Sequence, residues 1–462
     1  MLSTLSTADI EFVNAVDTGF LDLDRNPALV THMGILWVLD GEPSWSALMA
    51  AVDDLVARMP RLRQRARSVP FRGFAWVDDP EFAVERHVRR VETTPKACVD
   101  DVLHAASAQF GDTLDRSKPL WDATWYRSLR GGGSALLLRF HHALVDGVGL
   151  QRAILGPPPP ERGSGPQQGL AAFGPALGFV AQARRVAEHV SWLGRAAVRG
   201  MTDEAFRSDA GQQLSAHAVH LRTLARRPRR AFGEPSFARR LAAARVPLVQ
   251  FRQAAADRGG RINDLFVAVA LETTRRCLVE ADVVPPRLRA TMPINLRGEG
   301  DAQFTNVFAR ALVDVPVGQD SLLDDLSHLA EVVERARDVN SVPVGPLVAE
   351  LYALMPAVLR RRTHEAVMTF PDTLASNLNV PCPPITFAGH VVRELYPLAP
   401  GIAVPTALAV VSYDDHLHVG LTAHSGLLPD AVRAEEHLRA VLAELVPSER
   451  VTRALAQQAP GP

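Results

Sequence analysis

The sequence predicts a mixed α/β (α+β) protein of two domains. Its 462 residues exceed the size at which single hydrophobic cores stop growing, about 250–300 residues. Short apolar runs typical of buried strands alternate with segments of helical periodicity. A proline- and glycine-rich stretch over residues 156–166 interrupts both patterns and predicts a linker. We therefore expect an N-terminal domain over 1–155, a linker with crossover helices over 156–230 and a C-terminal domain over 231–462.

The first third of the chain reads as alternating strands and helices. Residues 34–40 are apolar, branched and aromatic, which predicts a buried strand. A helix follows, with Ser44 or Ser46 as its cap, and it ends near Pro60. Residues 123–126 and 134–140 flank a cluster of three glycines and predict a β-hairpin or two neighbouring strands.

The second half begins with a predicted amphipathic helical region over residues 175–227. This region either packs on the protein or lies on a lipid surface, and its sparse cationic face favours packing on the protein. The second domain then starts near Pro235. It alternates helices such as 261–279 with strands such as 307–315 and 406–413, which predicts mixed α/β structure.

Composition excludes several classes of protein. Hydrophobic residues make up 47% and charged residues 22%, which is typical of a globular chain. A net charge of −1 gives no electrostatic reason to bind nucleic acid. The 3 cysteines are widely spaced, so neither a disulfide framework nor a zinc site is expected. The start lacks a basic region followed by an apolar core, and no apolar run could span a bilayer. We expect a cytoplasmic protein.

The main catalytic candidate is a pair of adjacent histidines, His141 and His142, followed by Asp146 and Gly147. They end the strand predicted over 134–140, where consecutive side chains point to opposite faces. At most one histidine can therefore face a cavity, while the other is tied into the structure. Histidine titrates near neutrality and suits a general base, and His142, next to the turn, is our candidate. The alternative is a buried pair that only hydrogen-bonds to the backbone, with Asp146 capping the turn.

Several further segments occur in a fixed order around the histidines. They are LSTAD (5–9), THMG (31–34), WVDDPEF (76–82), LDRSKPLW (114–121), IND (262–264), MPINLR (292–297), NVP (379–381) and SY (412–413). Together with the HHxxxDG pattern they resemble the wax ester synthase/diacylglycerol acyltransferase family over nearly the whole chain. The family usually has glycine where Thr305 and Cys382 stand here. Because such glycines mark positive φ or close approach to a ligand, we expect a differently shaped acceptor or acyl channel.

The resemblance implies a fold like that of chloramphenicol acetyltransferase and other CoA-dependent acyltransferases, with a tunnel between two domains. His142 would take the proton of an acceptor hydroxyl during attack on acyl-CoA and return it to the CoA thiolate, without a covalent intermediate. Asp146 is expected to orient the motif through an arginine, His141 to be structural and Gly147 to serve the turn.

Other residues in the matched segments are open to two interpretations. Asn263 and Ser412 are candidate oxyanion donors. The alternative for Asn263 and Asp264 is a helix N-cap, which we favour. Trp121 is expected in the core, and Arg297 either binds CoA phosphates or forms an internal ion pair. His416 and His418 are assigned no metal.

The expected reaction is transfer of a long-chain acyl group from acyl-CoA to a fatty alcohol or to diacylglycerol, with no cofactor. Two alternatives remain: a same-fold acyltransferase with a specialised alcohol or amine acceptor or a carrier-protein donor, and a catalytically silent lipid-binding protein. No P-loop, dinucleotide-binding fingerprint or serine-hydrolase elbow is present. Acyl chain length, acceptor identity, oligomeric state and association with the inner membrane or lipid droplets are left open.

Overall fold

A computed structural model describes most of both halves of the chain. The described residues are 11–24, 26, 29, 31–69, 73–147, 149–150, 154, 191, 202, 238–283, 285–295, 308–317, 321–324, 326–340, 355, 357–368, 371–378, 384–402, 404–428 and 430–446. The linker expected over 156–166 lies outside them. So does the helical region expected over 175–227, apart from Ser191 and Thr202, which are helical.

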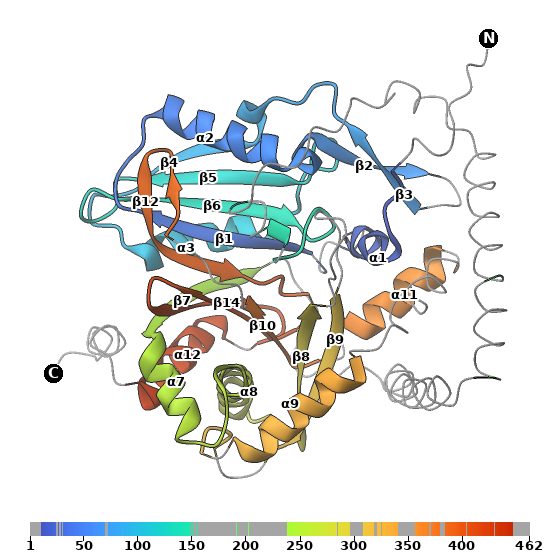
Figure 1. Cartoon of the computed structure of the whole chain (residues 1–462), viewed down its shortest axis with the longest axis vertical. Helices are drawn as coiled ribbons and strands as arrows, with labels where there is room; N and C mark the ends of the chain where they lie inside the picture. Colours follow the sequence, from blue (N-terminus) through green and yellow to red (C-terminus); the bar gives the residue numbers. More distant parts are fainter. Residues whose placement is uncertain are drawn as a thin grey trace.

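Two six-stranded sheets organise the molecule (Figure 1). The first has the order β11-β12-β1-β6-β5-β4. Its strands are β1 (His32–Leu39), β4 (Val88–Glu92), β5 (Trp121–Arg127), β6 (Ser134–His141), β11 (Thr386–Phe387) and β12 (His390–Leu398). The strand expected over 34–40 and the pair of strands around the glycine cluster are confirmed as β1 and as antiparallel β5 and β6.

Helices cover both faces of the first sheet. Helix α2 (Trp45–Arg58) begins at the predicted cap Ser44, whose hydroxyl accepts the Ala47 amide, and ends before Pro60 as expected. Its apolar face packs with Trp37 and Trp121, so Trp121 is in the core as predicted. Helix α3 (Val99–Gly111) packs on the opposite face. The remaining elements of this half are α1 (Ala15–Leu23), η3 (Pro60–Arg63), β2 (Gln64–Val69), β3 (Gly73–Asp78) and η4 (Val84–Arg86).

The second sheet has the order β7-β14-β13-β10-β8-β9. Its strands are β7 (Arg239–Pro247), β8 (Arg287–Asn295), β9 (Phe308–Pro316), β10 (Thr373–Leu378), β13 (Thr406–Tyr413) and β14 (His416–His424). Helices α7 (Leu248–Ala256), α8 (Ile262–Glu280), α9 (Ser327–Asn340) and α12 (Ala431–Leu445) share a core with the sheet, and α11 (Ala357–Met368) lies beside α1 (Figure 1). The expected helix 261–279 and strands 307–315 and 406–413 are confirmed.

One strand of the second half lies in the first sheet. β12 pairs antiparallel with β1, in a register that places Leu398 opposite Gly34. The same strand crosses β14 so closely that a Cβ at Gly420 would lie 1.8 Å from the Pro397 carbonyl oxygen. Residues 231–462 were assigned to one domain from the sequence, whereas the sheet built mainly by residues 32–141 includes β11 and β12.

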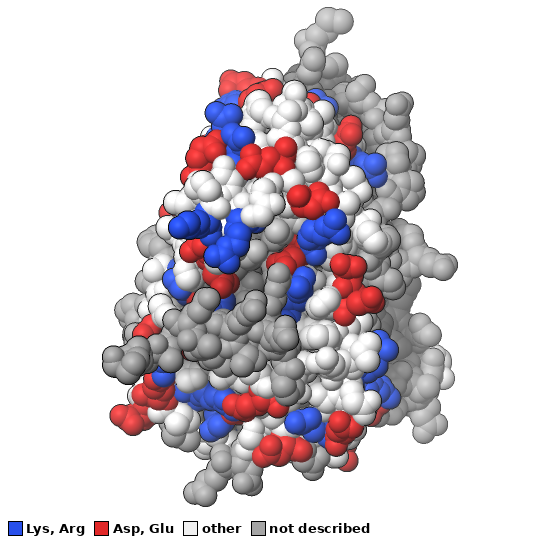
Figure 2. All heavy atoms as spheres, turned by 90° about the vertical axis from the view of Figure 1, so that its left-hand side faces the viewer, with Lys and Arg blue, Asp and Glu red and all other residues white. Residues whose placement is uncertain are grey.

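The surface carries charge of both signs. On the face shown in Figure 2, Lys and Arg side chains are interspersed with Asp and Glu side chains over the described residues. Among the described residues, no helix has both the length and the apolarity needed to cross a bilayer.

Candidate active site

The turn after β6 directs the two histidines to different places. β6 ends at His141, and the His142 backbone amide donates to the Thr31 carbonyl at 3.1 Å. The His142 ring stacks on Phe20 of α1, with centroids 4.5 Å apart and planes inclined by 19°. His142 is half-buried and lines a cavity between the two sheets, whereas His141 is fully buried. The expected separation of the pair is therefore observed.

His141 is held by hydrogen bonds at both ring nitrogens. Nδ1 accepts the Ala143 amide at 3.0 Å, so the proton of the neutral ring is on Nε2. Nε2 lies 2.8 Å from both Asp24 Oδ2 and Thr31 Oγ1. The Thr31 amide and hydroxyl donate to Asp24 Oδ1. Burial alone would raise the pKa of Asp24, but His141, Thr31 and Arg116 lower it to about 2. These contacts fix the turn that carries His142.

Asp146 caps the helical residues that follow the motif. Its carboxylate accepts the Gly149 amide at 2.7 Å, and its side chain is buried. This hydrogen bond satisfies one of the backbone amides that have no intrahelical partner at the start of a helix, as an N-cap side chain does. Asp146 therefore orients the motif through the backbone. The arginine partner expected from the sequence stays a prediction.

Gly147 serves close packing, and the turn role expected from the sequence is wrong. The residue is helical, and its φ lies outside the left-handed region. A Cβ at this position would lie 2.4 Å from Cδ2 of Leu378 on β10. The absence of a side chain therefore lets the motif approach the opposite wall of the cavity.

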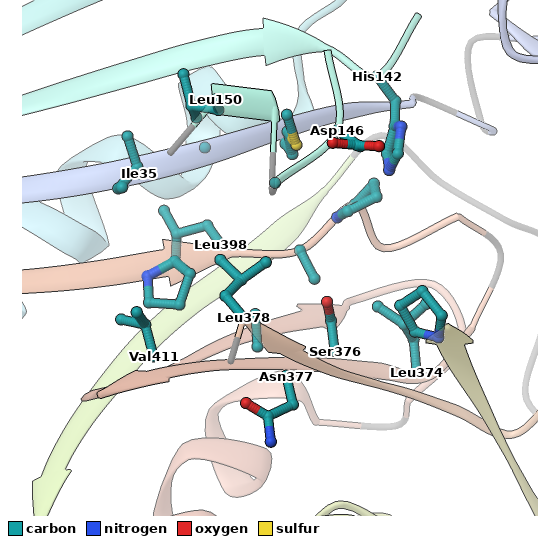
Figure 3. Close-up of a pocket in the computed structure, with 18 of the residues that line it drawn as sticks. Ile35, His142, Asp146, Leu150, Leu374, Ser376, Asn377, Leu378, Leu398 and Val411 are labelled. Atoms are coloured by element: carbon teal, nitrogen blue, oxygen red, sulfur yellow. The ribbon is translucent and has the colours of Figure 1, made fainter. Parts of the chain in front are cut away.

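The cavity lies between the sheets and has an empty volume of about 1520 Å³, part of it open to solvent (Figure 3). Strands β1 and β12 form one wall, and β8, β10 and β13 form the other. Apolar side chains dominate the described lining residues, which is typical of sites for lipid-like ligands. Phe20 of α1 and Met368 of α11 also line it, and the buried Asp22–Arg360 ion pair, 2.7 Å long, joins those two helices.

Strand β10 faces His142 across the cavity. Ser376 and the two leucines at alternate positions, Leu374 and Leu378, point into the cavity, whereas Asn377 points away from it (Figure 3). The Asn377 side-chain amide donates to Asn263 Oδ1 on α8 at 3.2 Å. Neither Ser376 nor Asn377 was selected from the sequence, because alternation along a six-residue strand does not tell which face meets the cavity.

The Asn263-Asp264 pair begins α8 and is absent from the described lining of the cavity. The N-cap of the helix is Arg261, two residues before Asn263, so the N-cap role favoured for Asn263 and Asp264 is wrong. Asp264 instead accepts the Arg261 amide at 2.8 Å, as in a capping box. Asn263 instead connects α8 to β10 through Asn377. It also lies 3.5 Å from the Met292 sulfur.

Ser412 lies on β13, and the residues of β13 that line the cavity are Ala409 and Val411. The structure therefore places this predicted oxyanion donor outside the described lining. Arg297, Thr305 and Cys382 lie outside the described residues. Within the described part of the chain, no group of three metal-ligating side chains is found.

Comparisons with known proteins agree with this arrangement. Residues 13–266 match the family model of the wax ester synthase/diacylglycerol acyltransferase catalytic domain, and residues 304–446 match that of the WS/DGAT C-terminal domain. The O-acyltransferase WSD of Acinetobacter baylyi is 24% identical over 92% of this chain and 95% of its own length. A putative diacylglycerol O-acyltransferase of Mycobacterium tuberculosis is 28% identical over 83% of this chain and 82% of its own.

Solved structures show the same fold. A wax ester synthase/diacylglycerol acyltransferase from Marinobacter aquaeolei superposes with a TM-score of 0.60 and 21% identity, covering 94% of this chain and 98% of the other. The first condensation domain of the calcium-dependent antibiotic synthetase superposes with a TM-score of 0.55 and 15% identity, over 94% and 96% of the two chains.

Proposed function

The chain belongs to the wax ester synthase/diacylglycerol acyltransferase family, and from this premise we propose that His142 is the general base of its acyl transfer. The family reaction moves an acyl group from acyl-CoA to a fatty alcohol, giving a wax ester, or to diacylglycerol, giving triacylglycerol. The observation that supports His142 is its position: of the two motif histidines, it is the one on the cavity wall.

In this mechanism the His142 imidazole removes the proton from the acceptor hydroxyl. The hydroxyl oxygen attacks the thioester carbonyl and forms the new C–O bond, and the carbonyl electron pair moves to oxygen. Collapse of this oxyanion breaks the C–S bond and restores the carbonyl. The imidazolium then protonates the departing CoA thiolate, so that the base returns to its starting state without a covalent acyl-enzyme.

The apolar lining supports lipid substrates. Acyl and alkyl chains gain free energy by leaving water, about 0.8 kcal/mol for each buried CH₂. The cavity offers these chains apolar side chains from both sheets, among them Ile35 and Leu398 of the first sheet and Leu378 and Val411 of the second (Figure 3).

We also propose that the protein takes its lipid acceptors from a membrane or lipid-droplet surface. Val358 and Leu359 on α11 are 59% and 52% exposed, and Met368 at the end of this helix lines the cavity. Flotation with phosphatidylglycerol vesicles is expected to recover the wild type, and Val358→Ser/Leu359→Ser is expected to reduce its recovery. Equal recovery of both proteins would contradict a membrane-binding role for Val358 and Leu359.

The decisive experiment measures CoA release from palmitoyl-CoA with hexadecanol, with a diacylglycerol and without acceptor. His142→Ala is expected to lose about 10²- to 10⁴-fold in turnover, the usual contribution of a general base, while remaining folded by circular dichroism. His390→Ala, which removes a histidine outside the described lining, is the matched control. Unchanged turnover in His142→Ala refutes the assignment. Absence of acceptor-dependent release in the wild type favours a specialised acceptor or a silent binding protein.

A further inference from the structure

We propose that the Ser376 hydroxyl donates a hydrogen bond to the oxyanion formed during acyl transfer. The inference rests on the proposed function, because it requires His142 to activate the acceptor. It assigns to β10 the role that the sequence suggested for Asn263 or Ser412.

The reaction needs a hydrogen-bond donor inside the cavity. Negative charge develops on the thioester oxygen while apolar side chains keep water from it, so a fixed donor stabilises the transition state more than it would in bulk water. Five of the described lining residues carry polar side chains: His142, Asp146, Thr291, Ser376 and Asn377. The proton transfers occupy His142, which leaves four candidates.

Three of the four are poorly suited to this task. Asp146 is an acceptor-only carboxylate when ionised, and it is engaged by the Gly149 amide. Asn377 points away from the cavity and donates to Asn263 (Figure 3). Thr291 is only 3% exposed on β8, so little of its side chain reaches the cavity.

Ser376 meets the requirement in position and in chemistry. Its side chain is half-buried, and its oxygen points into the cavity, towards the wall that carries His142 and Asp146 (Figure 3). Within the described part of the chain the structure assigns this hydroxyl no hydrogen-bond partner, so it can donate to a ligand. Leu374 and Leu378 flank it on the same face with apolar side chains.

The neighbouring Asn377 keeps this donor in place. Because consecutive strand residues face opposite sides, the Asn377–Asn263 bond holds the rear of β10 against α8 while Ser376 faces the substrate. Pairing with β13, which places Ser376 opposite Ala409, fixes the strand along its length. Asn263 is thus a positioning residue, which gives the Asn-Asp segment a function at a distance from the reacting atoms.

The test compares Ser376→Ala, Ser376→Cys and Ser376→Thr while palmitoyl-CoA and hexadecanol are each varied, so that kcat and both KM values are measured. Loss of one oxyanion donor costs about 10²- to 10³-fold in kcat. We expect this loss in Ser376→Ala, with KM for both substrates changed by less than about twofold. Cysteine has nearly the size of serine but is a weak donor, so Ser376→Cys is expected to resemble Ser376→Ala. Threonine retains the hydroxyl, and Ser376→Thr is expected to recover most of the turnover.

Several results would overturn the proposal. Full kcat in Ser376→Ala beside an inactive His142→Ala rejects the oxyanion role and leaves the proposed function intact. A raised KM for hexadecanol with unchanged kcat makes Ser376 a ground-state contact of the acceptor. If Ser412→Ala loses kcat and Ser376→Ala does not, the oxyanion donor is Ser412 on β13. Ser425→Ala changes an exposed serine in the same way and serves as the control, with wild-type kcat expected. Activity in both Ser376→Ala and His142→Ala rejects the proposed function as well.

Discussion

His141 Nε2 lies 2.8 Å from Asp24 Oδ2, with 1% and 6% of the two side chains exposed. The first histidine of the motif is thereby tied to the residue that follows α1, the helix whose Phe20 stacks on the second histidine. His142 is therefore fixed in two ways: its ring stacks on Phe20, and the residue before it, His141, is bound to Asp24.

Removing the Asp24 charge is expected to destabilise the protein in a pH-dependent way. The pKa of Asp24 is about 2 in the folded chain and 3.8 in the reference state, which corresponds to about 2 kcal/mol of stability. This stability is present above pH 4 and is lost as the pH falls through 2. The difference in free energy of unfolding between wild type and Asp24→Asn, measured with urea, should therefore shrink below about pH 4. Asp54→Asn on the exposed face of α2 is the control, and a pH-independent difference speaks against the pair.

Adding a methyl group at Gly147 is expected to displace Leu378. Overpacking costs about 1–3 kcal/mol of stability. Because the atom that must move is the end of the flexible Leu378 side chain, we expect Gly147→Ala to fall at the low end of this range and to lower kcat/KM severalfold as that side chain is displaced in the cavity. Leu378→Ala alone enlarges the same space, and the double variant should recover most of the lost activity. If the double variant is as poor as Gly147→Ala, the contact with Leu378 is not the reason for glycine here.

The Asn263–Asn377 hydrogen bond is expected to couple α8 to β10 energetically. A double-mutant cycle with Asn263→Ala and Asn377→Ala should give a coupling of about 1 kcal/mol in thermal unfolding. Either single variant should also lower kcat, because Ser376 is then less well positioned. Retained stability in Asn263→Ala, or strictly additive effects, would contradict the contact.

His418 is expected to make the protein sensitive to mild acid. It is fully buried on β14 beside the rings of Tyr396 and Tyr413. Burial lowers its pKa from 6.5 to about 4, Glu394 opposes this change, and Arg245 and His416 add to it. Below pH 6.5 the unfolded chain therefore binds a proton at His418 that the folded chain does not. The free energy of unfolding decreases as the pH falls from 6.5 towards 4.

The measurement for His418 is the free energy of unfolding between pH 7 and pH 4. The difference between its two pKa values corresponds to about 3 kcal/mol over this range. His418→Leu should reduce the stability lost between pH 7 and pH 4 by about 3 kcal/mol while keeping stability at pH 7, since an apolar side chain of similar size fills the site. Burial also lowers the pKa values of His32 and His424, which contribute their own acid sensitivity to both proteins. An equally steep acid limb in His418→Leu would assign the sensitivity to other groups.

Local features of the fold were predictable because neighbouring residues determine them. Ser44 and Pro60 set the ends of α2, and the glycine cluster sets the pairing of β5 with β6. The separation of His141 from His142 follows from strand geometry alone. The order of the segments around the motif was sufficient to recognise the family.

Long-range features of the site were not predictable in this way. Asp24, the partner of His141, is distant in the sequence and belongs to no recognised pattern. The contact of Gly147 with Leu378 depends on how two sheets meet, and so does the choice of Ser376 over Ser412. A strand pattern shows that two faces exist, but only the packing of the sheets decides which face meets the substrate.

The pairing of β12, from the second half of the chain, with β1 of the first sheet determines when this protein can fold during synthesis. β1 spans residues 32–39, and its neighbour β12 over residues 390–398 is synthesised long after it. Until then one edge of β1 has unpaired backbone groups, and exposed edges of this kind attract other strands. Contacts between distant segments also slow folding. The two halves are thus expected to be insoluble when produced as separate fragments, because the cavity wall made by β1 and β12 forms only after residues 390–398 have been synthesised.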